Sequence, residues 1–360
     1  MRIAYWTTAS LEPDIEAVSR EVFDLAGHFR DSMVFGVSPH LRLRAGRRPR
    51  HFGAHPSLDP LLRLAIPAIE RTTRINHVYA ETSPWLYFKT LRRRPTVLTI
   101  ASEKGEVNAE FLDRVDAITV QTDAMHRRLS AVERWRCKLS LLYPGVDLKR
   151  FNATARRPGA FGGTKPRILF ATFPRSREEI GPRGVDLLID LAKGNPAVQF
   201  DLLTRPWARG DTASAAVRAR LRSEGGANIR LLEGRRERME DVYREYDFTV
   251  IPYTRADGGK ECPLSLVEGM ACGIPALISS VAPFSEFVDR NRCGVTFAPD
   301  PASFALAIDA ALSRYEELRA GAIDSARRHF DRESLFRRFE RLYDAIESPG
   351  SMSAIGDRVV

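Results

Sequence analysis

The sequence predicts an α/β protein made of two doubly wound domains. Short apolar runs alternate with amphipathic segments along the chain, which is typical of parallel sheets covered by helices on both faces. The chain has 360 residues, which is too long for one ordinary core and favours two domains. Near the middle, "TARRPGAFGGTK" (Thr154 to Lys165) is rich in glycine and basic residues and lacks periodicity, so it predicts a linker.

Each half supplies six candidate strands. In the first half they are "RIAYW" (2–6), "SMVFGV" (32–37), "HVYAE" (77–81), "TVLTIA" (96–101), "AITVQT" (117–122) and "LSLLY" (139–143). In the second half they are "RILFATF" (167–173), "VQFDLLT" (198–204), "IRLLE" (229–233), "FTVIPY" (248–253), "PALISS" (275–280) and "GVTFA" (294–298). The last helix is expected at about Arg332 to Glu347, since it carries apolar residues at helical spacing: Leu335, Phe336, Phe339, Leu342 and Tyr343.

These patterns give a division of the chain. We expect a first domain over residues 1–153, a linker over 154–165 and a second domain over 166–330. A C-terminal helix over 331–348 is expected to pack back on the first domain, and 349–360 is expected to be a flexible tail.

Composition indicates a globular enzyme. Hydrophobic residues make up 44% and charged residues 28% of the chain, unlike a disordered or fibrous protein. The start "MRIAYWTTAS" lacks the features of a signal peptide, and no uncharged stretch approaches the roughly 20 residues that span a bilayer. The four cysteines form no CxxC pair, so we expect a reduced, cytoplasmic protein without a structural zinc site.

The net charge is concentrated in one region. Residues 42–94 hold 12 Lys and Arg against 3 Asp and Glu, a net of +9, which equals the net charge of the whole chain. This segment is either a solvated basic face or a surface for phosphate-bearing partners, such as lipid headgroups, a pyrophosphate-linked acceptor or nucleic acid. Its densest part contains Arg42, Arg44, Arg47, Arg48 and Arg50.

Candidate anion-binding residues follow the first strand of the second half. The segment "PRSREEIGPRGVDLLID" (Pro174 to Asp190) places Arg175, Arg177 and Arg183 in a loop and at the start of a helix expected near Gly184. Arginines beside a helix N-terminus favour an anion, because guanidinium donors, free N–H groups and the helix dipole act together. The alternative is that these arginines pair with Glu178 and Glu179.

Three motifs resemble the retaining glycosyltransferases of the GT-B fold often called family 4. "RSREEIGPRGVDLLI" is similar to that family's Arg, five residues, Lys-Gly element, with Arg183 where Lys is usual. "PGVDLKRF" (Pro144 to Phe151) is similar to its Gly-Val-Asp turn, and "ECPLSLVEGMACGIP" (Glu261 to Pro275) to its Glu, seven residues, Glu motif. The resemblance covers nearly the whole chain and is strongest from Ile168 to Pro275.

The resemblance implies two Rossmann-like domains facing across a cleft and a nucleoside-diphosphate sugar as donor. It implies that Glu268 holds the ribose hydroxyls and that the backbone of Pro263, Leu264 and Ser265 faces the sugar and diphosphate. Arg177, Arg183 and Glu261 are the catalytic candidates that it implies, with Arg175 and Lys260 as further donor-binding candidates. The transfer it implies retains the anomeric configuration, as expected in cell-envelope polysaccharide or glycolipid synthesis.

The sequence departs from the family pattern in three places. The first Glu of the motif would fall at Lys260, with Glu261 one place later, so either residue is a candidate for that role. After the "TVLTIA" strand the family often has His, where this chain has Ala101 and Ser102, followed by Glu103 and Lys104. The usual glycine-rich loop after the first strand is replaced by "TTASLEP" (Thr7 to Pro13).

We expect the chemistry to need neither a metal ion nor another cofactor. The charge that grows on the leaving phosphate can be met by Arg183 with Arg177 or Arg175, and the sequence has no convincing DxD pair. Closure of the two domains over the donor would exclude water.

The basic segment predicts the acceptor. Apolar residues lie among and after its arginines, as in "LDPLLRLAIPAI" (Leu58 to Ile69), and this combination suits an anionic membrane surface. We therefore expect a glycan, lipid-linked or otherwise anionic acceptor and peripheral association with the inner face of the membrane. Two alternatives stay open: a non-catalytic GT-B-like protein that binds nucleotide or glycan, and a nucleic-acid-binding protein. The latter leaves the second half unexplained and lacks interleaved aromatic residues, so we expect no nucleic-acid partner.

Overall fold

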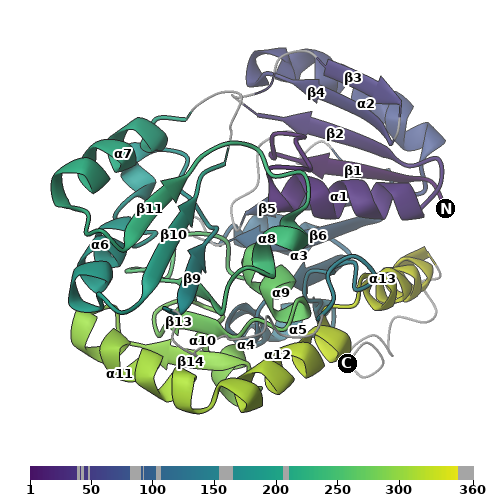
Figure 1. The fold of residues 1–360 in the computed structure, drawn as a ribbon. Helices are drawn as coiled ribbons and strands as arrows, with labels where there is room; N and C mark the ends of the chain where they lie inside the picture. The colour runs from purple at the N-terminus through teal and green to yellow at the C-terminus, as the bar shows by residue number, and fades with distance from the viewer. Residues whose placement is uncertain are drawn as a thin grey trace. The chain divides into compact units, whose positions relative to one another are not determined.

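The computed structural model describes residues 1–38, 41, 44–47, 49–81, 91, 93–102, 107–153, 165–205 and 211–347. It divides the chain into two compact units: unit 1 is Met1–Tyr143 with Glu333–Val360, and unit 2 is Pro144–Arg332. Each unit has one sheet with helices packed on it, so the predicted α/β class with two doubly wound sheets is confirmed (Figure 1). The expected linker, apart from Lys165, and the expected tail lie outside the described residues.

Unit 1 contains an eight-stranded sheet in the order β3-β4-β2-β1-β5-β6-β7-β8. All neighbouring strands in it are parallel except the antiparallel pair β3 and β4. The strands are β1 (Ile3–Thr7), β2 (Met33–Val37), β3 (Arg44–Arg47), β4 (Arg50–Ala54), β5 (Ile75–Glu81), β6 (Thr96–Ser102), β7 (Ala117–Val120) and β8 (Leu139–Leu141).

The β3–β4 hairpin lies within the basic segment and was not predicted from the sequence. Its residues, "RAGR" and "RHFGA", are rich in arginine and glycine and show little of the apolar alternation that marks a strand. Parallel pairing of β4 with the buried strand β2 supplies the missing stabilisation, from Met33 opposite Arg50 to Val37 opposite Ala54. Tertiary context therefore decides the conformation of this stretch.

Helices cover both faces of this sheet. One buried cluster joins the sheet to α1 and α13, and the other joins it to α2, α3 and α4. The helical segments of unit 1 are α1 (Ala17–His28), η1 (Pro56–Leu58), α2 (Asp59–Thr72), α3 (Ala109–Arg114), α4 (Asp123–Ser130), α5 (Glu133–Arg136) and α13, which begins at the unit boundary (Arg332–Glu347).

The C-terminal helix α13 is bound to the sheet of unit 1 by a buried polar network. The Tyr343 hydroxyl lies 2.6 Å from Nδ1 of His77 on β5 and 3.4 Å from the Tyr5 hydroxyl on β1. The other ring nitrogen of His77 lies 2.7 Å from Oγ1 of Thr99 on β6. Burial lowers the pKa of His77 to about 3, so its ring is neutral, with one nitrogen donating and the other accepting. Residues near both ends of the chain thus share one core.

Unit 2 contains a six-stranded parallel sheet in the order β11-β10-β9-β12-β13-β14. Its strands are β9 (Arg167–Phe170), β10 (Gln199–Leu203), β11 (Ile229–Leu232), β12 (Phe248–Ile251), β13 (Ala276–Ser279) and β14 (Gly294–Phe297). Its helical segments are η3 (Arg177–Glu179), α6 (Val185–Gly194), α7 (Ala213–Glu224), α8 (Met239–Tyr243), α9 (Leu264–Ala271), α10 (Ser285–Arg290), α11 (Pro301–Ser313) and α12 (Tyr315–His329).

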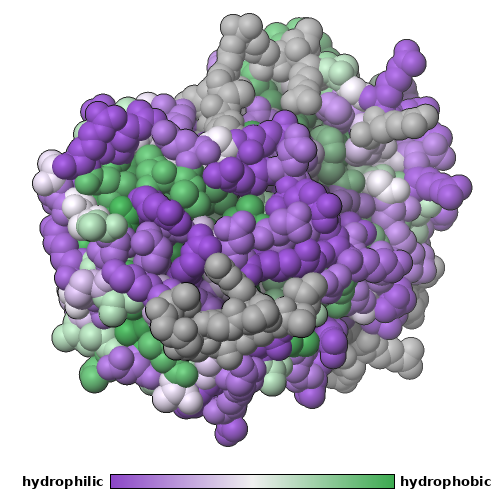
Figure 2. All heavy atoms as spheres, viewed as in Figure 1, coloured by the Kyte–Doolittle hydropathy of each residue, from purple (hydrophilic) through white to green (hydrophobic). Residues whose placement is uncertain are grey.

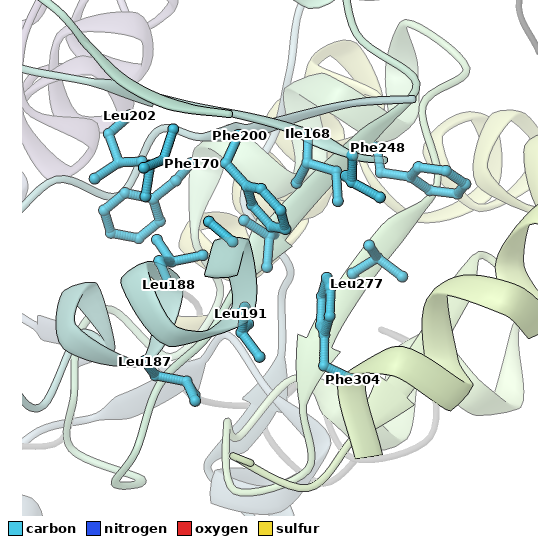
Figure 3. Close-up of a cluster of buried hydrophobic side chains, with 14 of the residues drawn as sticks. Ile168, Phe170, Leu187, Leu188, Leu191, Phe200, Leu202, Phe248, Leu277 and Phe304 are labelled. Carbon is cyan, nitrogen blue, oxygen red and sulfur yellow. The ribbon is translucent and has the colours of Figure 1, made fainter. Parts of the chain in front are cut away.

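The main core of unit 2 lies between the sheet and helices α6 and α11. Figure 3 shows Phe170 and Phe200 from neighbouring strands facing Leu188 and Leu191 of α6, with Phe304 of α11 alongside. On the face shown in Figure 2, hydrophilic side chains cover most of the surface, and apolar side chains gather near α7 and the edge strand β11. Both residues Leu231 and Leu232 of β11 are half-buried, as expected of a strand that ends a sheet.

A buried carboxylate joins three strands of unit 2. Asp201 on β10 is fully buried and accepts two hydrogen bonds from Arg230 on β11, at 2.6 and 2.8 Å. Tyr246 and Gln199 donate to the same carboxylate at 2.8 and 2.9 Å, and Arg167 on β9 donates at 3.3 Å. Burial raises the pKa of Asp201, but the hydrogen bonds from Arg230, Tyr246 and Gln199 outweigh it and lower this pKa below its usual value.

We expect Asp201→Asn to lower the free energy of unfolding by about 2 kcal/mol at neutral pH, because hydrogen bonds to a charged acceptor are lost. A lowered folded pKa stabilises the fold fully above the unfolded value of about 4, and that stabilisation is lost as pH falls through the folded value. The two proteins should therefore converge in stability at acid pH. Urea unfolding at pH 7 and pH 3 measures this.

The matched control is Asp190→Asn, which changes an exposed carboxylate of α6 paired with Lys193 at 3.6 Å. Its stability should equal that of the wild type at both pH values, because exposed pairs contribute little. Equal stability of Asp201→Asn and the wild type at pH 7 would show that the cluster does not stabilise the sheet.

Candidate functional site

The order of the second sheet defines where a ligand can bind in unit 2. The chain enters at β9 and continues to β10 on one side, whereas β12 lies on the other side of β9. In open parallel sheets, ligands bind outside the carboxyl ends of the strands at such a reversal of strand order. The loops that leave β9 and β12 lie at this reversal, and they contain most of the residues singled out in the sequence.

These two loops are packed directly on each other. Gly184, the residue before α6, has φ of 77°, and a Cβ placed on it would lie 1.8 Å from the carbonyl oxygen of Pro252. Thr254 donates its N–H to the Pro182 carbonyl at 3.1 Å and its hydroxyl to the Gly181 carbonyl at 3.0 Å. A Cβ on Gly258 would lie 2.4 Å from that same Pro182 oxygen. Glycine is needed at 184 for both its backbone conformation and its lack of a side chain.

Arg183 is fixed within this loop pair by two acceptors. Its Nε donates to Oε2 of Glu179 at 3.1 Å and its Nη1 to the Thr172 carbonyl at 3.1 Å, and the side chain is 19% exposed. The same Glu179 oxygen accepts the backbone N–H of Arg175 at 2.9 Å. The alternative that one of the arginines pairs with a neighbouring glutamate is thus realised for Arg183. The guanidinium is held in one orientation at the start of α6.

Arg177 lies apart from this arrangement. It begins η3 and its side chain is exposed, while its backbone N–H donates to the Thr212 hydroxyl at 3.2 Å. Arg175 is half-buried, and its carbonyl accepts the Thr212 N–H at 3.0 Å. Of the two candidates for the partner of Arg183, Arg175 therefore shares an acceptor with it and Arg177 does not.

Two residues that the sequence analysis missed lie beside Arg183. Tyr253 lies two residues after the end of β12 and is 1% exposed. Burial raises its pKa, while the positive charges of Arg183 and Arg205 act to lower it. Arg205, two residues after the end of β10, donates to the Ala171 carbonyl at 3.2 Å. Arg205 follows the predicted strand 198–204 and Tyr253 is the last residue of the predicted strand 248–253, so position at the carboxyl end of a strand was the available signal.

Helix α9 follows the loop after β12 and carries the second half of the Glu motif. It begins at Leu264 after Pro263, and no side chain caps its N-terminus. Gly269 packs against Thr249 of β12, where a Cβ would lie 2.7 Å from the threonine methyl group. The Ser265 hydroxyl near the start is buried and has no hydrogen-bond partner among the described residues. This helix start offers free N–H groups and a positive dipole end.

Glu268 lies inside the fold on α9. It is 4% exposed, and its Oε2 accepts a 2.9 Å hydrogen bond from the hydroxyl of Tyr243 on α8, which is fully buried. The Glu268 charge also contributes, after burial, to raising the pKa of Cys272 to about 12. The structure thus gives Glu268 a protein partner on one carboxylate oxygen.

The two candidates for the first acidic position differ in burial. Glu261 is 2% exposed, whereas Lys260 is half-buried. A Cβ on the adjacent Gly259 would lie 2.2 Å from the Tyr253 hydroxyl, which places this loop next to Tyr253. Pro263 and Leu264 are also buried at the start of α9.

The structure describes only some of the candidate site residues of unit 1. Arg47 and Arg50 are exposed on β3 and β4, Arg44 lies on β3, and Arg42 and Arg48 lie outside the described residues. Glu103 and Lys104 also lie outside them, and Ala101 is buried in β6.

The loop after β1 is anchored by Leu11. Leu11 has φ of 59° and is fully buried, with its side chain against Gly36 of β2 and Gly53 of β4. Glu16 accepts hydrogen bonds from the Ser10 N–H, the Ser10 hydroxyl and the Ser19 hydroxyl, at 2.5, 2.6 and 2.8 Å. The loop is thus held by a buried apolar side chain with a strained backbone and by the hydrogen bonds to Glu16.

In the described part of the chain, no group of three or more His, Cys, Asp and Glu side chains is arranged to hold a metal ion. Among the described helices, none combines the length and apolar character needed to cross a bilayer.

Two Rossmann-like units of this kind define the GT-B fold, and solved GT-B glycosyltransferases share it. Sucrose-phosphate synthase from Thermosynechococcus elongatus matches with a TM-score of 0.74 and 16% identity, over 97% of this chain and 100% of that one. HepE from Anabaena, in complex with UDP and glucose, matches with 0.74 and 15%, over 95% and 99%. The catalytic domain of starch synthase IV from Arabidopsis thaliana, bound to ADP and acarbose, matches with 0.63 and 14%, over 97% and 99%.

The family match lies in unit 2. Residues 184–314 match the family described as glycosyl transferases group 1. The match begins at Gly184 and includes the whole of α9. No curated protein sequence matches the chain.

We expect Gly184→Ala to lower the free energy of unfolding by about 2 kcal/mol or more, because the methyl group would meet the Pro252 carbonyl and φ is positive. Gly194→Ala is the matched control, since it changes the last residue of the same helix, where a Cβ meets nothing within 4 Å. Urea unfolding of both variants measures the difference. Equal stability would mean that the loops after β9 and β12 separate at little cost.

Proposed function

We propose that the protein transfers a sugar from a nucleoside-diphosphate sugar to an acceptor with retention of the anomeric configuration. The observation that carries this proposal is the fixed guanidinium of Arg183 at the start of α6, where strand order reverses. The group 1 family match begins at the adjacent residue, and related folds have been solved with UDP or ADP bound. Together these findings support a nucleotide-sugar donor.

The proposed chemistry depends on positive charge that is fixed before the reaction begins. Charge grows on the outer phosphate as the bond to the sugar breaks, and preorganised donors are usually the largest catalytic contribution. Arg183 supplies that charge with Arg175 or Arg177, and Glu261 is the proposed catalytic carboxylate. We propose that this arrangement needs no metal ion or further cofactor.

The donor is proposed to lie along the start of α9. The N–H groups of Leu264 and Ser265 after Pro263 would face the sugar and diphosphate, with Lys260 beside them. Glu268 would accept hydrogen bonds from the ribose hydroxyls while Tyr243 holds its other side. The Tyr243 contact orients the carboxylate in advance.

The acceptor is proposed to be a glycan or lipid-linked, anionic molecule used in cell-envelope polysaccharide or glycolipid synthesis. The support is the net charge of +9 in residues 42–94, which includes the exposed Arg47 and Arg50. Peripheral association with the inner membrane face follows from the same charge. A second candidate, a non-catalytic GT-B-like protein that binds nucleotide or glycan, is favoured by Lys260 at the usual position of an acidic residue.

A panel of UDP-, GDP- and ADP-sugars, assayed for released nucleoside diphosphate, tests the function. We expect release from one donor class and expect Arg183→Ala to lower kcat about 100-fold or more with little change in KM, because it meets charge that is larger in the transition state. Arg183→Lys should recover part of the loss, since it keeps the charge but loses the forked contacts to Glu179 and Thr172.

The exposed Arg222→Ala on α7 is the control and should keep full turnover. Arg175→Ala and Arg177→Ala in the same assay show which arginine assists Arg183. Nucleotide binding without turnover for every donor would favour the non-catalytic protein, and an unchanged kcat for Arg183→Ala would remove Arg183 from the mechanism.

Glu268→Gln should weaken donor binding by about 1.5–3 kcal/mol, because an amide replaces the charge-assisted bonds to the ribose only in part. Tyr243→Phe should give a smaller loss, since it frees Glu268 without removing the charge. Calorimetric titration with the active nucleotide measures both, and Glu224→Gln, an exposed carboxylate of α7, is the control. Equal affinities of Glu268→Gln and the wild type would refute the ribose role.

A further inference from the structure

Helix α2 of unit 1 presents apolar side chains on two faces. On its inner face Leu62 and Ile66 are buried with Phe35, Val37 and Ala54 of the sheet. On its outer face a stripe of exposed residues follows helical spacing, i, i+3, i+4 and i+7: Leu61, Leu64, Ala65 and Ala68. The inner face alone accounts for the packing of α2 on the sheet.

The exposure of the two leucines is unusual for this protein. Leu61 is 64% and Leu64 is 79% exposed, and the other large apolar residues exposed in the described part of the chain are Val281 and Leu306. Those two are far from each other in the sequence, whereas Leu61 and Leu64 lie about one helical turn apart. The leucines therefore form one apolar ridge.

The neighbouring hairpin carries an unfavourable pair of like charges. Arg47 on β3 lies directly opposite Arg50 on β4 in the antiparallel register, so both side chains are on one face of the sheet. Both are exposed, and neither forms an ion pair with an acidic residue in the described ranges. Like charges directly opposite each other destabilise a strand pair, and an anion between them removes that cost.

The arginine pair and α2 lie on the same face of the sheet. The side chains of residues 50, 52 and 54 of β4 point to one side of the sheet. On that side Ala54 belongs to the cluster that holds Leu62 and Ile66, and Phe52 packs against this cluster. Figure 1 shows α2 beside β3 and β4. Arg50 lies roughly 13 Å before Ala54 along β4, so the pair is near the C-terminal half of α2, where Arg71 is also exposed.

The charge around the ridge is one-sided. Residues 44–74 contain seven arginines against two acidic residues, a net of 7 − 2 = +5. One of those acids, Glu70, is 1% exposed and accepts hydrogen bonds from Asn76 and from the Arg93 backbone, at 2.8 and 3.2 Å. It is therefore turned away from the outer surface of α2.

We propose that the outer face of α2 and the Arg47–Arg50 pair form a docking surface for an anionic lipid bilayer. The helix lies in the plane of the interface, Leu61 and Leu64 enter the acyl boundary, and the arginines contact headgroup phosphates. A ridge of two leucines and two alanines with a basic border offers little area for a stable protein interface, whereas it suits a bilayer. This inference rests on the peripheral membrane association given under the proposed function, and it assigns that association to this surface.

Co-sedimentation with vesicles of phosphatidylcholine, alone or with phosphatidylglycerol, tests the surface without any sugar nucleotide. We expect binding to the anionic vesicles, weakened roughly tenfold or more by Leu61→Ser/Leu64→Ser, by Arg47→Ser/Arg50→Ser and by raised salt. Leu306→Ser is the matched control, because Leu306 is 74% exposed on α11 of unit 2. It should leave binding unchanged.

Hydrogen exchange gives a second measurement that does not depend on the variants. In the wild type, anionic vesicles should slow amide exchange within 59–72 and leave α11 unaffected. Binding that survives the leucine change, or equal binding to neutral vesicles, would overturn the proposal. So would a lipid-free dimer that the leucine change dissociates, since α2 would then contact a second copy. Diphosphate release is measured without vesicles, so failure of the docking surface and failure of the transferase function are separate results.

Discussion

The contact between Gly184 and the Pro252 carbonyl is the constraint on which the candidate site depends. It brings the loops after β9 and β12 together, and those loops come from strands that are adjacent in the sheet but about 80 residues apart in the chain. Arg183, the residue before Gly184, is positioned by this contact. Its guanidinium is oriented by hydrogen bonds to Glu179 and to the Thr172 carbonyl. The rigid core between the sheet, α6 and α11 supports both loops. A site built this way needs few side chains, because the backbone does most of the positioning.

Much of the fold could be predicted from the sequence, because the central strands are continuous apolar runs. All twelve expected strands are present, with ends displaced by a few residues, and α13 spans the expected residues. The β3–β4 hairpin could not be predicted in this way, since arginine and glycine have no strand preference and pairing with β2 decides its structure. Leu11 is a similar case, because its left-handed backbone depends on Gly36 and Gly53 from other strands.

The candidate site could be predicted only where chain position carries the information. The sequence singles out Arg183 and Glu268 as candidates because they follow strands and lie in recognisable motifs. The Glu179 contact with Arg183, the Tyr243 contact with Glu268 and the position of Arg205 were not, since each depends on how loops and helices meet in space. The pairing of an arginine with Glu179 had looked like an alternative to a functional role. In the structure the pairing holds the guanidinium of Arg183 in one orientation.

The return of α13 to unit 1 has a consequence for the order in which the protein can be made. The buried contacts of Tyr343 with Tyr5 and His77 unite residues separated by 338 and 266 positions. During synthesis β1 emerges before unit 2, and α13 emerges after it. Until then the part of the sheet face that Phe339 and Leu342 cover in the folded protein stays exposed, with α1 beside it. Unit 2 is continuous and can complete its core first, so unit 1, whose sheet is synthesised before unit 2, finishes folding after it.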